Sequence, residues 1–190
     1  MRKLIGGLDT ETTGLDYEKG DRIIEVCLQV WDFHERKPLT NFTQRINPVG
    51  QRISAKAQKV HGITAADLVG KPVFKEVAPK LDAMLKRCEG VVTHNGEWFD
   101  LPFLAHEFAQ VGVSLPSIES FDTMQNGMFA SYDTKPPRLE EFCWAMGVEY
   151  DPAKAHAADY DVDVMMKGFF NAADLGYFDV SEFLGLEEAA

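Results

Sequence analysis

The first third of the chain shows the alternation of apolar and polar residues that is typical of β-strands. An apolar run over residues 4–8 predicts a short buried strand, and regular alternation over residues 23–33 predicts a second. A third strand is expected over residues 42–46. Because the segments that connect these three strands are short, we expect them to pair in antiparallel fashion.

After about residue 64 the apolar residues recur at helical spacing instead. Thr64 is expected to cap a short helix that ends at Leu68, and the apolar positions between residues 73 and 88 fall on one face of a longer helix. Further elements are expected along the rest of the chain: strands over 90–93 and 117–121, and helices over 100–111, 139–146 and 158–173. Three antiparallel strands followed by alternating helices and strands predict an α/β fold with a mixed sheet flanked by helices.

Composition places the chain among soluble globular proteins. Its 190 residues, 45% hydrophobic and 26% charged, suit one domain, expected over residues 1–175 with a short acidic tail over 176–190. The apolar runs are too short to span a bilayer and no signal peptide is recognisable, so we expect a cytoplasmic protein without membrane association. Three widely spaced cysteines lack metal-binding spacing and are expected to be buried: Cys27, Cys88 and Cys143.

The net charge of −11 argues against attraction of nucleic acid by the surface as a whole. A site made of carboxylates and divalent cations could nevertheless act on nucleic acid, and a local basic patch could hold its phosphates. The best cluster for that role is Arg45, Arg52, Lys56 and Lys59, whose alternative interpretation is a solvated charged face.

Two acidic residues stand at the end of the first predicted strand. Asp9 and Glu11 are two positions apart, so their side chains point the same way. Neighbouring carboxylates repel each other and resist burial unless a cation neutralises them. The alternative is a strand that runs into a polar turn with both acids solvated.

Further acidic positions could complete this pair. Asp100 opens a helix after Asn95-Gly96-x-x-Phe99, although an acid there also suits the positive end of the helix dipole. Asp122 is expected to cap the helix that follows it. Three aspartates follow His156 around the start of the last long helix: Asp159, Asp161 and Asp163. Helical phase does not separate the first two of these.

Taken together, the motifs resemble those of the DEDDh 3′→5′ exonucleases. The resemblance rests on Asp9-x-Glu11, Asn95-Gly96-x-x-Phe99-Asp100 and His156-x-Ala158-x-x-Asp161, and it extends over about residues 4–173. It implies an RNase H-like fold and a site with two Mg²⁺ or Mn²⁺ ions. It also selects Asp161 among the three aspartates by family spacing.

The resemblance implies a role for each matched residue. Asp9 would bridge both metal ions, Glu11 and Asp161 would hold the ion that carries the attacking water, and Asp100 would support the other ion through water. His156 would be the general base. The product would be a nucleoside 5′-monophosphate released from a 3′ end.

The resemblance also implies contacts with the terminal nucleotide. The positions concerned are Thr10, Thr12, Leu15, Val60, His61 and Phe99. For His61 the alternative is a loop histidine bonded to backbone groups, and Phe99 could belong to the core.

The expected function is therefore metal-dependent 3′→5′ hydrolysis of DNA or RNA, with single-stranded nucleic acid carrying a free 3′ end as the partner. Three alternatives stay open: a polymerase-associated proofreading subunit, a non-catalytic nucleic-acid-binding module, and a phosphohydrolase acting on nucleotides. Short RNA is an alternative substrate. A homodimer and a polymerase partner both stay open as well.

Overall fold

The fold is built on a five-stranded sheet, seen in a computed structural model that describes residues 2–133 and 135–185. The strands lie in the order β3-β2-β1-β4-β5. Their bounds are β1 Leu4–Thr12, β2 Ile23–Asp32, β3 Lys37–Arg45, β4 Gly90–Thr93 and β5 Glu119–Asp122. β1, β2 and β3 pair antiparallel, whereas β4 and β5 continue the sheet in parallel from β1. The predicted mixed α/β sheet is confirmed.

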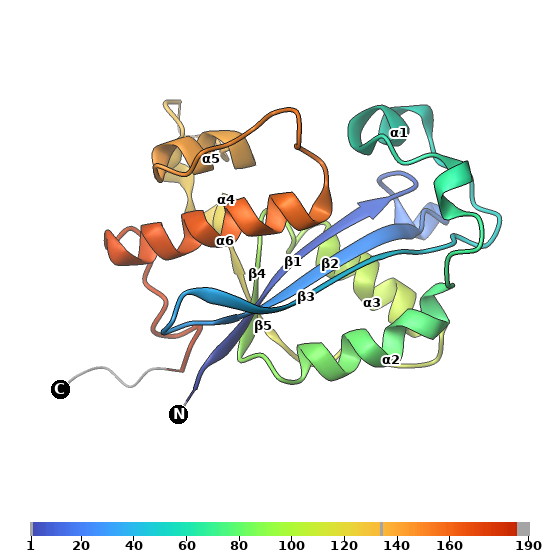
Figure 1. The fold of residues 1–190 in the computed structure, drawn as a ribbon, viewed down its shortest axis with the longest axis horizontal. Coiled ribbons are helices and arrows are strands. Elements are labelled where there is room, and N and C mark those ends of the chain that lie inside the picture. The colour runs from blue at the N-terminus through green and yellow to red at the C-terminus, as the bar shows by residue number, and fades with distance from the viewer. Residues whose placement is uncertain (1, 134, 186–190) are drawn as a thin grey trace.

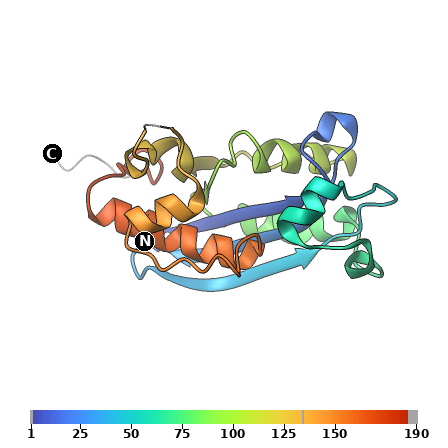
Figure 2. The ribbon, with the colours of Figure 1, turned by 90° about the horizontal axis from the view of Figure 1, so that it is seen from above.

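Helices cover both faces of this sheet. They are α1 Ala55–His61, α2 Phe74–Leu85, α3 Asp100–Gln110, α4 Thr123–Asn126, α5 Leu139–Ala145 and α6 Ala158–Asp174. α5 and α6 pack on one face and α2 and α3 on the other, as Figures 1 and 2 show. Because both faces are covered, every residue of β2 is buried.

Strand β1 lies at the centre of the sheet and presents alternate residues to the two layers. Ile5 belongs to the core beneath α5 and α6, and Leu8 belongs to the core against α2 and α3. Gly7 lies directly under α6, because a Cβ atom there would come within 2.7 Å of both Val162 and Met166. The absence of a side chain at Gly7 thus lets α6 pack against β1.

Helix α1 and strand β3 differ from the sequence-based expectation, and β1 continues to Thr12, beyond the expected residues 4–8. Helix α1 was not predicted, and it buries none of its residues, so no apolar face marks it in the sequence. Strand β3 begins at Lys37 rather than at residue 42, because its exposed first half carries no alternating pattern. By contrast, the predicted cap at Thr64 is confirmed, since its hydroxyl accepts the Asp67 N–H.

The described part of the expected acidic tail takes part in the core. Phe178, Phe183 and Leu184 are buried with the residues of α5 and α6, and the Lys3 ammonium donates to the Leu184 carbonyl. Residues 186–190 lie outside the described part of the chain. Within that part, no helix combines the length and the apolar character needed to cross a membrane. All three cysteines are free, and Cys27 and Cys143 are buried as expected, whereas Cys88 is only partly buried.

Candidate active site

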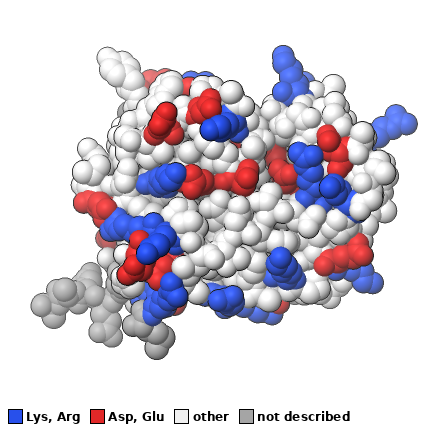
Figure 3. Space-filling view, viewed as in Figure 1, with Lys and Arg blue, Asp and Glu red and all other residues white. Residues whose placement is uncertain are grey.

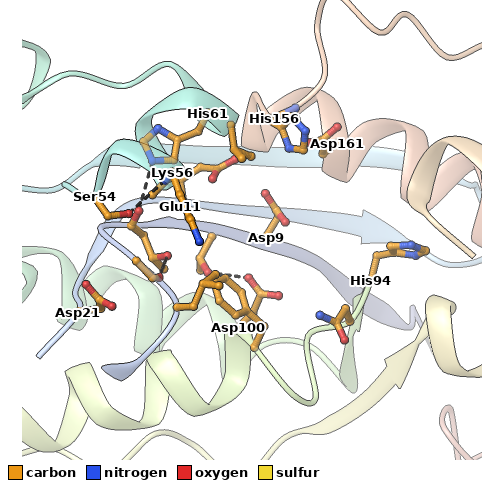
Figure 4. A pocket seen from close by; sticks show the side chains of 18 residues that line it. Asp9, Glu11, Asp21, Ser54, Lys56, His61, His94, Asp100, His156 and Asp161 are labelled. Carbon is orange, nitrogen blue, oxygen red and sulfur yellow. Dashed lines mark hydrogen bonds between the residues drawn. The ribbon is translucent and has the colours of Figure 1, made fainter. Parts of the chain in front are cut away.

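A cavity of about 520 Å³ opens beside the carboxyl end of β1. Asp9 and Glu11 reach it from β1, Asp100 from the start of α3, Asp161 from the first turn of α6, and His156 from the loop before α6 (Figure 4). Figure 3 shows a hollow between the part of the molecule that contains α5 and α6 and the part that contains α1. The structure thus brings all five expected residues to one place.

Three of these residues form a tight group. Glu11, His156 and Asp161 each offer one ligand atom, and these atoms lie within 4.8 Å of one another. Asp161 Oδ2 accepts the His156 N–H at 2.8 Å, whereas Asp161 Oδ1 is buried and has no hydrogen-bond partner among the described residues. Because a buried carboxylate oxygen without a partner is costly, this atom is suited to ligate a cation. Carboxylate oxygens are the ligands that hard divalent cations prefer.

Asp100 is held by its neighbour on the central strand. Thr10 Oγ1 donates a hydrogen bond of 2.6 Å to Asp100 Oδ1, and both side chains are buried. Because Thr10 follows Asp9 directly along β1, one strand both supplies a carboxylate and orients a second. This bond fixes Asp100 beside the Asp9–Glu11 pair.

Burial opposes the ionisation of the four carboxylates. Burial raises the pKa of Asp9 well above its usual range, and the carboxylates of Asp100, Glu11 and Asp161 raise it further. Burial, together with the Asp161 carboxylate, raises the pKa of Glu11 to about 8. Burial also raises the pKa of Asp100 and of Asp161 to about 6. Positive charge in the cavity would favour the ionised forms of all four.

His156 is held in an uncommon backbone conformation. Its φ of 63° lies in the left-handed region, which residues other than glycine rarely adopt. The hydrogen bond from its backbone N–H to Asp161 secures this conformation. The exposed imidazole consequently stands in the cavity beside Glu11 and Asp161.

The structure separates the three aspartates that follow His156. Asp161 lines the cavity. Asp159 is exposed and accepts the backbone N–H of its neighbour, Tyr160, while Asp163 forms an ion pair of 2.6 Å with Lys167. Neither of these two lines the cavity, so the geometry agrees with the choice of Asp161.

Asp122 organises the loop that leads to Asp100. It caps α4 by accepting the N–H groups of Met124 and Gln125, as predicted. It also accepts the N–H groups of Asn95 at 2.9 Å and Glu97 at 3.3 Å, which the sequence did not reveal. Asp122 is fully buried, so it fixes the loop after β4 to the end of β5.

All six residues expected to contact a terminal nucleotide line the cavity. Leu15 and Val60 are 81% and 53% exposed, which makes them apolar positions at the rim. Phe99 is only partly buried and packs against the ring of Phe103, with the ring centres 5.0 Å apart. Phe99 therefore belongs both to the edge of the core and to the cavity wall.

His61 connects the end of α1 to the end of β1. Its Nδ1 accepts the Ile63 N–H at 3.0 Å, so the proton lies on Nε2, which donates to the Thr12 carbonyl at 3.2 Å. Burial lowers the pKa of His61, which favours this neutral form. Both ring nitrogens are thus engaged by backbone groups, while the ring lines the cavity.

The sequence did not single out several further residues around the site. Asp21 lines the cavity and lies so close to Gly14 that a Cβ atom there would come within 2.3 Å of its carboxylate. Glu25 is buried on β2 opposite Glu11, where it pairs with Arg45 at 3.0 Å. The register of the predicted β1–β2 hairpin could have placed Glu25 there. Lys56 was named from the sequence as a member of the basic cluster, but no apolar pattern could have placed α1, which carries it to the cavity.

Comparison with known proteins agrees with this architecture. The chain matches the sequence model of a family described as "Exonuclease" over residues 7–169. It is 30% identical to DNA polymerase III subunit epsilon of Pasteurella multocida over 165 residues, which are 83% of this chain and 63% of that protein. The chain therefore spans less than two thirds of the length of this relative.

Solved structures show the same fold. The nuclease domain of 3'hExo, a DEDDh family member bound to rAMP, superposes with a TM-score of 0.74 at 18% identity and covers 92% of this chain and 94% of that one. The zinc-bound complex of E. coli ExoI with single-stranded DNA gives a TM-score of 0.77 at 17% identity, over 92% and 41% of the two chains. The expected RNase H-like arrangement is confirmed. From the family match and the three motifs, the chain belongs to the exonuclease family, in its DEDDh group of 3′→5′ exonucleases.

Proposed function

We propose that this protein is a metal-dependent 3′→5′ exonuclease that releases nucleoside 5′-monophosphates from single-stranded DNA or RNA. One observation carries the proposal. Four carboxylates and His156 converge on one cavity, in which Asp161 Oδ1 is buried without a hydrogen-bond partner among the described residues. Such a set is suited to phosphodiester hydrolysis assisted by two hard cations.

The donor set fits two Mg²⁺ or Mn²⁺ ions. Asp9 would contact both, Glu11 and Asp161 would hold one, and Asp100 would support the other. When bound, the ions would neutralise the carboxylates and withdraw charge from the phosphate under attack. The raised pKa values of these carboxylates are consistent with a site completed by positive charge.

The chain's own residues supply the remaining steps. His156 takes the proton from the attacking water, a role for which histidine is the side chain most often used. Its backbone bond to Asp161 keeps the imidazole at the edge of the carboxylate group. Thr10 keeps Asp100 oriented, so that the four carboxylates remain directed into the cavity.

The rim of the cavity supplies the contacts for the terminal nucleotide. Leu15 and Val60 offer apolar surface to a base or sugar, and Phe99 offers an aromatic ring. Thr10, Thr12 and His61 complete this proposed contact set. Relatives solved with single-stranded DNA and with rAMP support a nucleic-acid substrate, and they leave both DNA and RNA as substrates to test.

The test compares variants on 5′-labelled single-stranded DNA and RNA oligonucleotides with Mg²⁺. Asp9→Ala and Asp161→Asn are expected to lower the rate by more than about a hundredfold, because each removes a metal ligand. Asp159→Asn is the matched control, since this aspartate lies outside the cavity. A ladder of progressively shorter labelled strands indicates attack from the 3′ end. Full activity of Asp9→Ala, or a labelled mononucleotide as first product, would contradict the proposal.

A relative named as a subunit of DNA polymerase III supports a second candidate, a proofreading subunit that works beside a polymerase. Gel filtration with candidate polymerases tests it, since a stable complex is expected only if this candidate is correct. The same experiment reports whether the chain forms a homodimer. A cytoplasmic location, where such substrates and partners occur, is part of the proposal.

A further inference from the structure

Helix α1 brings a lysine to the acidic cavity. Lys56 is the second residue of this helix, which Ser54 caps. Figure 4 shows the Lys56 side chain extending from α1 into the cavity, with its nitrogen inside. Lys56 is the sole lysine or arginine among the described residues that line this cavity.

The other members of the basic cluster are placed differently. Arg45 is occupied by ion pairs with Glu25 and Asp67. Arg52 lines a separate groove, and Lys59 lines neither that groove nor the cavity. The structure therefore leaves Lys56 as the cluster member that can meet a ligand in the acidic site.

Lys56 has no partner within the described chain. Although five acidic residues line the same cavity, its ammonium forms no ion pair or hydrogen bond with any described residue. Its place in the first turn of α1 is also unfavourable, because the helix dipole repels a cation there. Neither an ion pair nor the helix dipole thus accounts for a cation at this point.

We propose that Lys56 binds a substrate phosphate, namely the one in the second linkage from the 3′ end. This inference rests on the proposed function, in which the cations held by the carboxylates take the phosphate under attack. The neighbouring phosphate is then the anion available to an ammonium that shares the cavity with them. A lysine on a flexible stem presents three donors, which suit a phosphate whose position is fixed by the terminal nucleotide.

The first experiment measures kcat and KM of Lys56→Ala and Lys59→Ala on a single-stranded oligonucleotide. Lys59→Ala removes the same charge from the same helix outside the cavity. Lys56→Ala should raise KM by about three- to tenfold, with kcat little changed. It should also make the slope of log affinity against log salt concentration less steep by about one. Lys56→Arg should retain most of the affinity. Equal KM values for the two alanine variants would overturn the proposal.

A chemical variant of the substrate locates the contact. Four oligonucleotides each carry a single neutral methylphosphonate, at the first, second, third or fourth linkage from the 3′ end. Their affinity for the protein is measured in EDTA by fluorescence anisotropy. Neutralising the second linkage should weaken wild-type binding as much as Lys56→Ala does, and the two changes together should add nothing. An effect of Lys56→Ala that persists with every modified substrate, or disappears only at the first linkage, would overturn the assignment.

Failure of this inference is distinguishable from failure of the proposed function. Binding in EDTA requires no catalysis, so a Lys56-dependent contact remains measurable even if wild-type protein degrades nothing. Conversely, wild-type degradation with no Lys56 effect would leave the exonuclease proposal standing and remove the phosphate contact. Folding of Lys56→Ala is checked by comparing its melting temperature with that of Lys59→Ala, which removes the same charge from the same helix.

Discussion

The carboxylates of the cavity make the stability of the metal-free protein depend on pH. Burial raises the pKa of Glu11 from 4.5 to about 8, and that of Asp100 and Asp161 from 3.8 to about 6. A group whose pKa is raised on folding makes its full contribution to the free energy of unfolding below its unfolded-state pKa. That contribution is lost as the pH rises through its folded-state pKa. These groups should therefore weaken the chelated protein as pH rises from about 4 to about 8.

Mg²⁺ should reverse this loss, because it binds the ionised carboxylates of the folded state. At a concentration of a hundred times its Kd, one bound ion adds about 2.7 kcal/mol to the free energy of unfolding. Urea unfolding with EDTA and with Mg²⁺, at about pH 5 and about pH 8, should show a larger gain at the higher pH. Equal gains at both pH values would show that the carboxylates are not the cation site.

The hydrogen bond from Thr10 to Asp100 should matter for metal binding. Thr10→Val keeps the shape of the side chain but removes the donor, so Asp100 loses both its orientation and a bond that favours its ionised form. The Mg²⁺ concentration for half-maximal activity should rise by about tenfold or more, as is usual when a residue that orients a metal ligand is lost. Thr10→Ser keeps the hydroxyl and should resemble the wild type. A Thr10→Val variant with unchanged Mg²⁺ dependence would contradict this role.

The choice among the aspartates after His156 shows how far the sequence alone could go. Helical phase placed Asp159 and Asp161 at similar angles to the buried stripe, so only the family spacing favoured Asp161. The structure distinguishes them through the backbone of His156, whose left-handed φ turns the loop so that its N–H meets Asp161. A contact of this kind depends on tertiary geometry that a periodic pattern does not contain.

At the scale of elements, the loop between β4 and α3 depends on Asp122. Replacing it by Ala would leave four backbone N–H groups without their acceptor, among them those of Asn95 and Glu97. We expect Asp122→Ala to lower the free energy of unfolding by about 3 kcal/mol or more, because it removes a fully buried carboxylate that accepts four backbone hydrogen bonds. Activity should fall as well, since this loop leads directly to Asp100.

Glu97→Gln provides the control for this measurement. Glu97 is exposed, so its substitution should change the free energy of unfolding by less than about 0.5 kcal/mol. Urea denaturation of both variants, together with the rate on a labelled oligonucleotide, separates the role of the buried carboxylate from that of a surface acid. Similar losses for the two variants would contradict the importance given to Asp122.

The elements predicted from the sequence were those with a buried face. The strand at residues 23–33 and the helix at 158–173 agree closely with β2 and α6, because each buries apolar side chains at regular spacing. Helix α1 has no buried residue and owes its place to the Ser54 cap and to His61. Periodicity could not predict this helix. For the same reason the sequence could not predict that Lys56 lies at the cavity.

At the scale of the whole molecule, the packing of α6 on β1 sets the distance between Asp161 and the Asp9–Glu11 pair. Gly7→Ala would place a Cβ atom 2.7 Å from Val162 and Met166, so α6 would have to shift. We expect Gly7→Ala to lower the free energy of unfolding by about 1–3 kcal/mol. We also expect it to lower metal-dependent activity more than an equally destabilising substitution away from α6 does. Both effects share one cause, the displacement of the helix that carries Asp161.

Gly6→Ala is the matched control on the same strand. Its Cβ atom would meet Leu28 and Val91 on the other face of the sheet, at 2.9 and 3.1 Å, and would leave the contact with α6 intact. Unfolding and activity measured for both variants should show comparable loss of stability, but a greater loss of activity for Gly7→Ala. The same activity in two equally destabilised variants would contradict the link between α6 and the site.

The contact between Lys3 and Leu184 brings the two ends of the described chain together at the amino end of β1. Asp9 and Glu11 belong to the other end of the same strand, so the acidic cavity lies at the opposite end of β1 from this contact. An attachment made at either end of the described chain would consequently leave the entrance unobstructed. Immobilised on a bead or fused to a carrier, the protein would still present its cavity to an incoming strand.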